Sequence, residues 1–165
     1  MNPIPEEIVE NTWREMAELE PVDIIEYISE ISTDQPAIFA FLMATGHHVF
    51  NEDERETVMY LGMVVWRIMC QGTPRPREIS REVVEQAEAN NMRVLQGLAG
   101  ESPGDFIAIT EDMLLTYGQI EVLGYVIESL IMNEDTAAAR VREENKGWII
   151  MSLKTVIDSF DVSSG

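Results

Sequence analysis

The stretch VMYLGMVVWRIMC (residues 58–70) is apolar on nearly every side and contains one charged residue, Arg67. A helix on the surface of a globular protein has a polar face, whereas this stretch would bury almost its whole circumference. It is also much too short to cross a bilayer. We therefore predict that it forms a helix in the centre of a bundle. Asn51 is its expected N-cap, with Glu54 at the N3 position of a capping box.

Helical periodicity extends from this stretch in both directions, and signals for β-strands are nearly absent. Proline, serine, asparagine and glycine mark the expected helix ends. The expected helices are 5–17, 21–31, 36–50, 51–70, 80–99, one that begins at 103 and ends before Gly118, 119–132, and 134–160 with a kink or break near 145–147. The prediction is an all-α fold of about eight helices, in a single all-helical domain over residues 1–165.

Two parts of the chain resemble each other when the sequence is laid on itself with Pro21 on Pro103. Without any gap, this register also pairs Asp23 with Asp105, Ile25 with Ile107, Ile38 with Ile120, and the Asn-Glu-Asp run 51–53 with 133–135. Helix starts, breaks and apolar faces recur in the same register. We therefore predict two copies of a roughly 82-residue helical repeat, 1–72 and 80–160. An Arg- and Pro-containing linker, 73–79, joins them, and they pack as one compact bundle.

Charge is the unusual feature of the composition. Thirty acidic residues face eleven basic ones, which gives a formal net charge of −19. Such a surface repels phosphates and anionic lipid head groups, so we expect no direct nucleic-acid binding and no membrane association. The first residues lack the features of a signal peptide, so we expect a cytoplasmic protein. The single cysteine, Cys70, follows apolar residues and is expected to be a buried, structural thiol.

The only two histidines, His47 and His48, stand just before the acidic residues Glu52 and Asp53. One histidine with one of these carboxylates is a candidate site for a divalent metal. Adjacent residues on a helix point about 100° apart, so both histidines would not easily serve one ion. The alternative is a pair of partly exposed histidines at a helix end.

Arg75, Arg77 and Arg81 form a basic cluster around the predicted linker. Three arginines that converge would hold a phosphate or an acidic partner. The alternative is that each arginine pairs with an acidic residue of a neighbouring helix. We keep these residues as candidate partner-binding residues.

No motif in the sequence indicates a particular reaction, and we predict no cofactor. The leading hypothesis is a non-enzymatic acidic helical module that binds another protein. A basic partner would be steered to its surface by charge. The ten methionines and three tryptophans are expected in the core, although such residues also form adaptable binding grooves. Because the apolar content is substantial, a homodimer is a further prediction.

Two other function classes remain open at this point. One is a metal-dependent enzyme with carboxylate ligands that acts on a small phosphorylated molecule. Helices with the pattern Glu-x-x-Glu, such as Glu7 to Glu10, Glu82 to Glu85 and Glu85 to Glu88, motivate it, although no matching Glu-x-x-Asp helix follows at a suitable distance. The other is an inhibitor that mimics nucleic acid through its surface charge.

Overall fold

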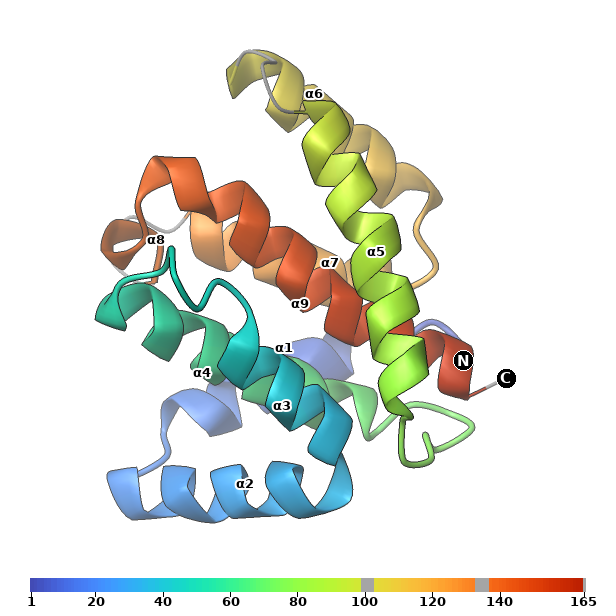
Figure 1. Ribbon diagram of the computed structural model, residues 1–165. Helices are drawn as coiled ribbons and strands as arrows, with labels where there is room; N and C mark the ends of the chain where they lie inside the picture. Colours follow the sequence, from blue (N-terminus) through green and yellow to red (C-terminus); the bar gives the residue numbers. More distant parts are fainter. Residues whose placement is uncertain (99–102, 133–136, 165) are drawn as a thin grey trace.

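The computed structural model describes residues 1–98, 103–132 and 137–164, and within these residues all regular secondary structure is helical. The prediction of an all-α fold is therefore confirmed. The elements are α1 (Glu6–Ala17), α2 (Pro21–Asp34), α3 (Pro36–Ala44), α4 (Glu52–Met69), α5 (Arg81–Leu98), α6 (Pro103–Thr116), α7 (Ile120–Ile127), the π-helix η1 (Glu128–Met132), α8 (Ala137–Arg140) and α9 (Glu143–Ser163) (Figure 1). No described helix is long and apolar enough to cross a membrane.

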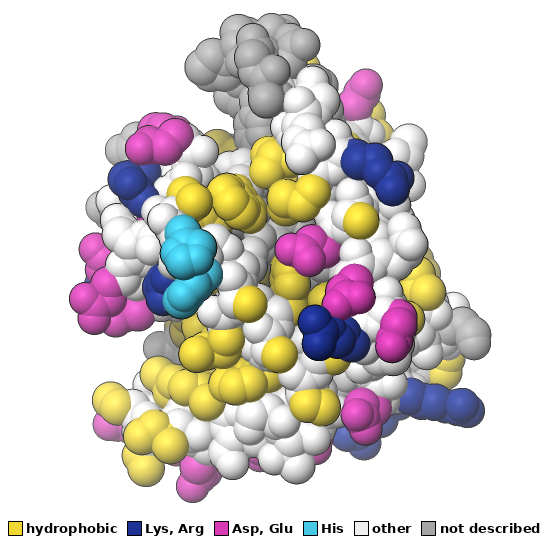
Figure 2. Space-filling view, in the orientation of Figure 1, with side chains coloured by type: hydrophobic (Ala, Val, Ile, Leu, Met, Phe, Trp, Pro, Cys, Tyr) yellow, Lys and Arg dark blue, Asp and Glu magenta, His cyan; other side chains and the backbone are white. Residues whose placement is uncertain are grey.

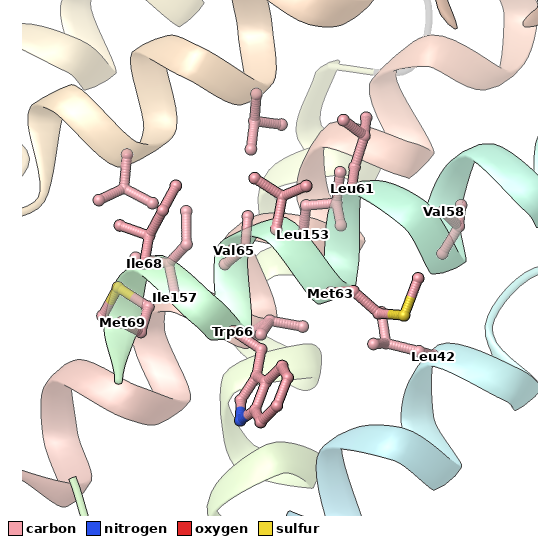
Figure 3. Packing of buried hydrophobic residues seen from close by; sticks show 14 of the residues in the cluster. Leu42, Val58, Leu61, Met63, Val65, Trp66, Ile68, Met69, Leu153 and Ile157 are labelled. Atoms are coloured by element: carbon pink, nitrogen blue, oxygen red, sulfur yellow. The ribbon is translucent and has the colours of Figure 1, made fainter. Parts of the chain in front are cut away.

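The central helix is α4, as its sequence predicts. It packs against α1, α2, α3, α7, α8 and α9. Figure 3 shows its side chains pointing in several directions, toward Leu42 of α3 and toward Leu153 and Ile157 of α9. Trp66, in the middle of α4, is 2% exposed, and its ring lies edge-on to that of Tyr27. One cluster of buried apolar side chains includes residues from both halves of the chain, so the halves share a core.

Helix α3 ends at Ala44, so the prediction that it continues to residue 50 is wrong. Gly46, which follows shortly after, has a φ of +63°, a conformation that favours glycine. The ring of Phe50 lies over this glycine, and an added Cβ would clash with it. The segment 45–50 therefore turns back on itself before α4 begins.

The last helical region is broken at Val141 and Arg142, rather than near residues 145–147, where the sequence analysis expected a kink. Helix α9 runs through Gly147 without interruption. Arg142 has an extended backbone, and its N–H donates to the carboxylate of Glu54 at 3.0 Å. A contact with α4 therefore holds the chain at the break, in place of the next turn of helix.

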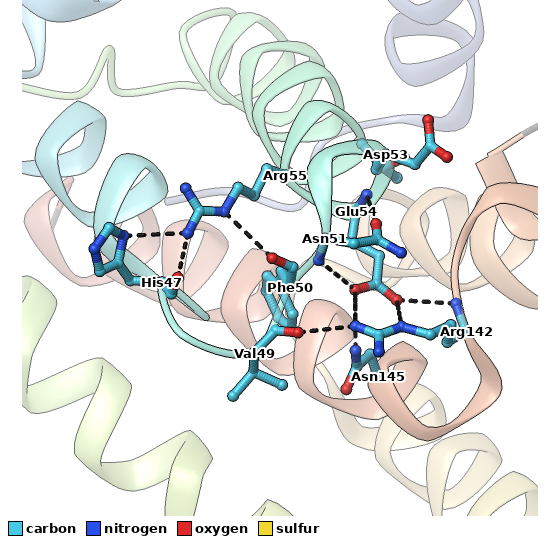
Figure 4. Close-up of polar contacts among 10 residues, drawn as sticks. His47, Val49, Phe50, Asn51, Asp53, Glu54, Arg55, Arg142 and Asn145 are labelled. Carbon is cyan, nitrogen blue, oxygen red and sulfur yellow. Dashed lines mark hydrogen bonds and ion pairs between the residues drawn. The ribbon is translucent and has the colours of Figure 1, made fainter.

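Glu54 lies at the start of α4 and is completely buried. It completes the predicted capping box with Asn51, because each residue's side chain accepts from the other's backbone N–H. Its carboxylate also accepts from the guanidinium of Arg142 at 2.8 and 3.0 Å and from Nδ2 of Asn145 at 3.0 Å (Figure 4). The hydrogen bonds from Arg142 hold its pKa at about 2, well below the usual 4.5.

Two buried glutamines, Gln35 and Gln119, each bind a distant segment of backbone through two hydrogen bonds. Gln35, before α3, donates to the carbonyl oxygen of Arg77 at 3.1 Å and accepts from the N–H of Ile79 at 2.9 Å. Gln119, before α7, donates to the carbonyl oxygen of Asn2 at 3.3 Å and accepts from the N–H of Ile4 at 3.0 Å. Gln35 therefore holds the segment before α5, and Gln119 holds the segment before α1. In each case the glutamine and the segment that it holds belong to different halves of the chain. We call these two sets of contacts the glutamine clasps.

Candidate functional site

A groove of about 980 Å³ lies where α1 packs beside α7, with α4 as its third wall. We call it the α1–α7 groove. Its lining residues are Glu6, Val9, Glu10, Trp13, Ala17, Ile24, Glu56, Thr57, Tyr60, Leu61, Leu114, Glu121, Gly124, Tyr125, Ile127, Glu128, Ser129 and Arg140. These residues come from helices far apart in the sequence, so the groove depends on the tertiary fold.

Five carboxylates line the α1–α7 groove. Four belong to exposed residues, Glu6, Glu56, Glu121 and Glu128, and the fifth, Glu10, is half-buried. Arg140 is the one lysine or arginine among the lining residues. It lies 3.9 Å from Glu56 and 3.2 Å from Asp53. Glu10 pairs with Arg14 at 3.3 Å, so the negative charge at the groove comes mainly from Glu6, Glu121 and Glu128.

The floor of the same groove is apolar and aromatic. Trp13, Tyr60 and Tyr125 are half-buried there. Burial raises the pKa of both tyrosines, so both stay neutral at physiological pH. The guanidinium of Arg14 lies 5.5 Å from the ring centre of Trp13. Aromatic rings beside carboxylates form a surface suited to the aliphatic stems and charged heads of lysine and arginine.

A second groove, of about 720 Å³, lies where α3 packs beside α5. We call it the α3–α5 groove. It is lined by Ala37, Ala40, Phe41, Ala44, Thr45, Gly46, His47, His48, Val49, Arg81, Val84, Glu85, Glu88 and Trp148. Figure 2 shows this face, with the two histidines beside hydrophobic side chains and with acidic and basic side chains over α5. Half of its lining residues are apolar, as in the α1–α7 groove, but two of them are acidic, against five in that groove.

The segment that carries His47 and His48 is fixed by polar contacts. Arg55 donates to the carbonyl oxygens of His47 and Phe50 and lies 3.2 Å from Nδ1 of His47 (Figure 4). Thr45 and Ser152 join their hydroxyls at 2.9 Å. These contacts hold the segment 45–50 in place, and this segment forms one side of the α3–α5 groove.

The predicted metal candidates are not gathered into a metal site. His47 has a guanidinium beside its ring, Asp53 pairs with Arg140 at 3.2 Å, and Glu52 is exposed in the first turn of α4. The rings of His47 and His48 contact each other edge to face, 4.7 Å between centres. Among the described residues, no group of three or more histidine, cysteine, aspartate or glutamate side chains is placed to hold a metal ion.

The three predicted arginines have separate surroundings. Arg81 pairs with Glu85 on its own helix at 2.7 Å and stands in the lining of the α3–α5 groove. The carbonyl oxygen of Arg77 is held by Gln35. The positive charge of Arg75 acts on the thiol of Cys70, whose pKa burial raises to about 11. Only Arg81 lines either of the two grooves.

Neither groove was predicted from the sequence, although tryptophans are residues that also form binding grooves. Trp13 and Trp148 were expected in the core, and both instead line grooves, with part of each ring packed on the core. Trp148 contacts Phe50 edge to face, 5.4 Å between ring centres. Of the three tryptophans, Trp66 alone is fully buried.

Comparisons of the chain with protein-family models, with curated proteins and with solved structures gave no match.

Proposed function

We propose that the chain is a protein-interaction module, and that its α1–α7 groove binds a basic helical segment of another protein. The observation that carries this proposal is the combination of five carboxylates at the edge of one groove with an aromatic floor. A partner helix would lay apolar side chains on Trp13, Tyr60 and Tyr125 and bring lysines or arginines to the edge. This is the helix-in-groove mode of recognition.

The size of the groove is consistent with such a partner. A volume of about 980 Å³ corresponds to roughly 12 Å of a helix about 10 Å in diameter, which is about two turns. Two turns present the apolar residues at positions i, i+3, i+4 and i+7 that helix-in-groove recognition uses. A net charge of −19 would speed the approach of a basic segment and make its binding sensitive to salt.

The architecture around the groove supports a second part of the proposal, that the chain contains two copies of one helical unit. The glutamine clasps are reciprocal. Gln35 holds the segment before α5, and Gln119 holds the segment before α1. Helix packing is reciprocal as well, because α1 contacts α7 while α5 contacts α3. The first helix of each unit would therefore pack on the last helix of its own unit, α4 or α9, and also on the third helix of the other unit.

Under this proposal the register between the copies changes along the chain. For α2 and α6 it places Pro21 on Pro103, because the bounds of the two helices then coincide. Continued into α3, that register would pair Ile38, which is fully buried, with Ile120, which is 39% exposed. For α3 and α7 we therefore propose the register that places Gln35 on Gln119. It pairs Ile38 with the fully buried Val122.

For the first helices we propose a third register, which aligns the starts of α1 and α5. It pairs Val9 with Val84, both 4% exposed. It also pairs Ile4 with Ile79, the two residues whose N–H groups the glutamines hold. The run 133–135, which the sequence analysis paired with 51–53, lies outside the described residues.

A titration with a designed peptide tests the binding proposal. The probe is an amphipathic helical peptide of leucine and lysine, and the control peptide has glutamate in place of lysine. Tryptophan fluorescence is followed in the Trp148→Phe variant, so that Trp13 is the only tryptophan left in either groove. We expect saturable binding of the lysine peptide that weakens with added salt. Absence of binding at low salt, or binding that ignores ionic strength, would contradict the proposal.

The two other hypotheses receive less support from the geometry. A mimic of nucleic acid would spread its carboxylates over a surface that faces a DNA-binding protein, whereas these five surround a groove with an aromatic floor. A carboxylate-based metal enzyme would need its ligands to converge, and Asp53 and Glu56 are instead close to Arg140. We propose the cytoplasm as the setting, where Cys70 would remain the free thiol that it is here.

A further inference from the structure

We propose that the α3–α5 groove is a second docking site, which takes a mainly apolar helix carrying a single basic residue. The chain would then hold two different segments at once, one in each groove. This inference goes beyond the binding proposed for the α1–α7 groove, because it concerns another groove with a different ligand chemistry, and it rests on the registers proposed above for the two copies.

The two grooves occupy equivalent places. In the register that aligns the starts of α1 and α5, the α1 residues of the first groove, Glu6, Val9, Glu10 and Trp13, fall on the α5 residues of the second, Arg81, Val84, Glu85 and Glu88. In the register that places Gln35 on Gln119, Ala37, Ala40, Phe41 and Ala44 of α3 and Thr45 directly after it fall on Glu121, Gly124 and Tyr125 of α7 and on Glu128 and Ser129 of η1. All of these residues line their grooves. Equivalent pairs of helices, α1 with α7 and α5 with α3, thus form the two grooves.

The chemistry differs at these equivalent positions. Glu121 and Glu128 of the first groove correspond to Ala37 and Ala44 of the second, so two carboxylates are replaced by methyl groups. The glutamate at position 6 corresponds to Arg81, which pairs with Glu85 on the same helix at 2.7 Å. The second groove therefore suits a partner with far fewer positive charges.

One negative charge in the α3–α5 groove is left for the partner. Glu88 is half-buried, and within the described residues no cation pairs with it. Burial and the neighbouring Glu85 raise its pKa, which is the sign of a carboxylate without a compensating charge. A lysine or arginine of an incoming helix would supply that charge. Phe41, Val49 and Trp148 would cover the apolar side chains that flank this lysine or arginine on the incoming helix.

The alanines allow the partner to come close. Ala40 and Ala44 are exposed in the lining of the groove, and small side chains let two helices approach closely. Figure 2 shows hydrophobic side chains on this face between the histidines and α5. The occupant we infer is thus a helix that presents leucine and alanine to α3 and one basic residue to α5.

The test uses the full chain with Trp13→Phe, so that Trp148 is the only tryptophan left in either groove. The probe is a helical peptide of about three turns, with a leucine and alanine stripe that contains one lysine and with glutamine on its other face. We expect saturable binding that Ala40→Leu weakens at least tenfold. Ala89→Leu, the same change at an exposed position of α5 outside the groove, should leave the affinity unchanged.

A second pair of measurements tests the role of Glu88. Glu88→Gln should weaken binding of the lysine peptide about threefold and should strengthen binding of the same peptide with norleucine in place of lysine. Binding that Ala40→Leu leaves intact would overturn the proposal. So would a homodimer, seen by light scattering, that Ala40→Leu dissociates while the peptide fails to bind. Because Trp13 and Trp148 report on different grooves, failure here is distinguishable from failure of the proposed function.

Discussion

Glu54 and Arg142, far apart in the sequence, join the start of α4 to the start of α9 through a buried carboxylate. The Glu54 side chain is fully buried, while that of Arg142 is 45% exposed. The carboxylate of Glu54 therefore has two roles. It caps α4, and it accepts a hydrogen bond from the backbone between α8 and α9. The contact fixes the relative position of the two helices at the centre of the bundle.

Removing the arginine should destabilise the fold, because Glu54 would keep its burial and lose its main donor. We expect Arg142→Ala to lower the free energy of unfolding by clearly more than the loss of a surface ion pair does. Arg140→Ala is the matched control, since Arg140 pairs with Asp53 at the exposed surface, and its cost should stay below about 1 kcal/mol. Urea unfolding followed by circular dichroism measures both. Equal effects of the two variants would contradict the importance of the buried pair.

Acid should remove the same contribution. The pKa of Glu54 is about 2 in the folded chain, against an ordinary value of 4.5. A carboxyl whose folded pKa is depressed stabilises the fold above its unfolded pKa, and this stabilisation is lost as pH falls through the folded pKa. The difference in unfolding free energy between wild type and Glu54→Gln should therefore be largest above about pH 5 and shrink toward pH 2. Urea unfolding across this pH range measures the difference. A difference that is constant with pH would contradict the low pKa of Glu54.

The glutamine clasps predict matched effects from two distant substitutions. Gln35→Ala and Gln119→Ala each leave a buried N–H and a carbonyl oxygen without their partner, which should cost about 2 kcal/mol. Amide exchange should accelerate at Ile79 in the first variant and at Ile4 in the second. Gln86→Ala is the control, because Gln86 only reaches Asn90 at the surface. If just one of the two clasps mattered, the reciprocal arrangement would lose its support.

The aromatic floor of the α1–α7 groove should contribute directly to binding. We expect Trp13→Ala to weaken binding of the leucine and lysine peptide roughly 10- to 30-fold, the usual effect of truncating an aromatic anchor. Trp148→Ala, in the other groove, should leave that affinity unchanged. Isothermal titration calorimetry measures both. A loss of similar size in both variants would indicate a general disturbance of the fold.

Local features of the fold were predictable from the sequence. Pro21 and the polar residues before Pro36 mark α2, and Asn51 with Glu54 marks the start of α4, because caps and prolines act within one turn. The end of α3 was not predictable in this way. The stop depends on Gly46 and on Phe50, whose ring fills the space over that glycine.

The sites were hidden because their parts meet only in three dimensions. The sequence indicated that Glu54 caps a helix, but not that its carboxylate also receives Arg142. Periodicity placed Trp13 and Trp148 on apolar faces, and a single chain does not show which part of an apolar face the rest of the fold covers. The prediction of a protein-interaction module was based on charge alone, and the α1–α7 groove is where we propose that the partner binds.

The most direct test of the account compares two variants with the same net charge. One neutralises four exposed carboxylates of the α1–α7 groove, Glu6, Glu56, Glu121 and Glu128, to glutamine. The other neutralises four exposed carboxylates elsewhere, Glu15, Glu30, Glu78 and Glu111. Calorimetric titration with the leucine and lysine peptide should show at least a tenfold loss of affinity in the first variant and less than a threefold loss in the second. Equal losses in the two variants would mean that overall charge attracts the peptide, and would contradict a binding site in this groove.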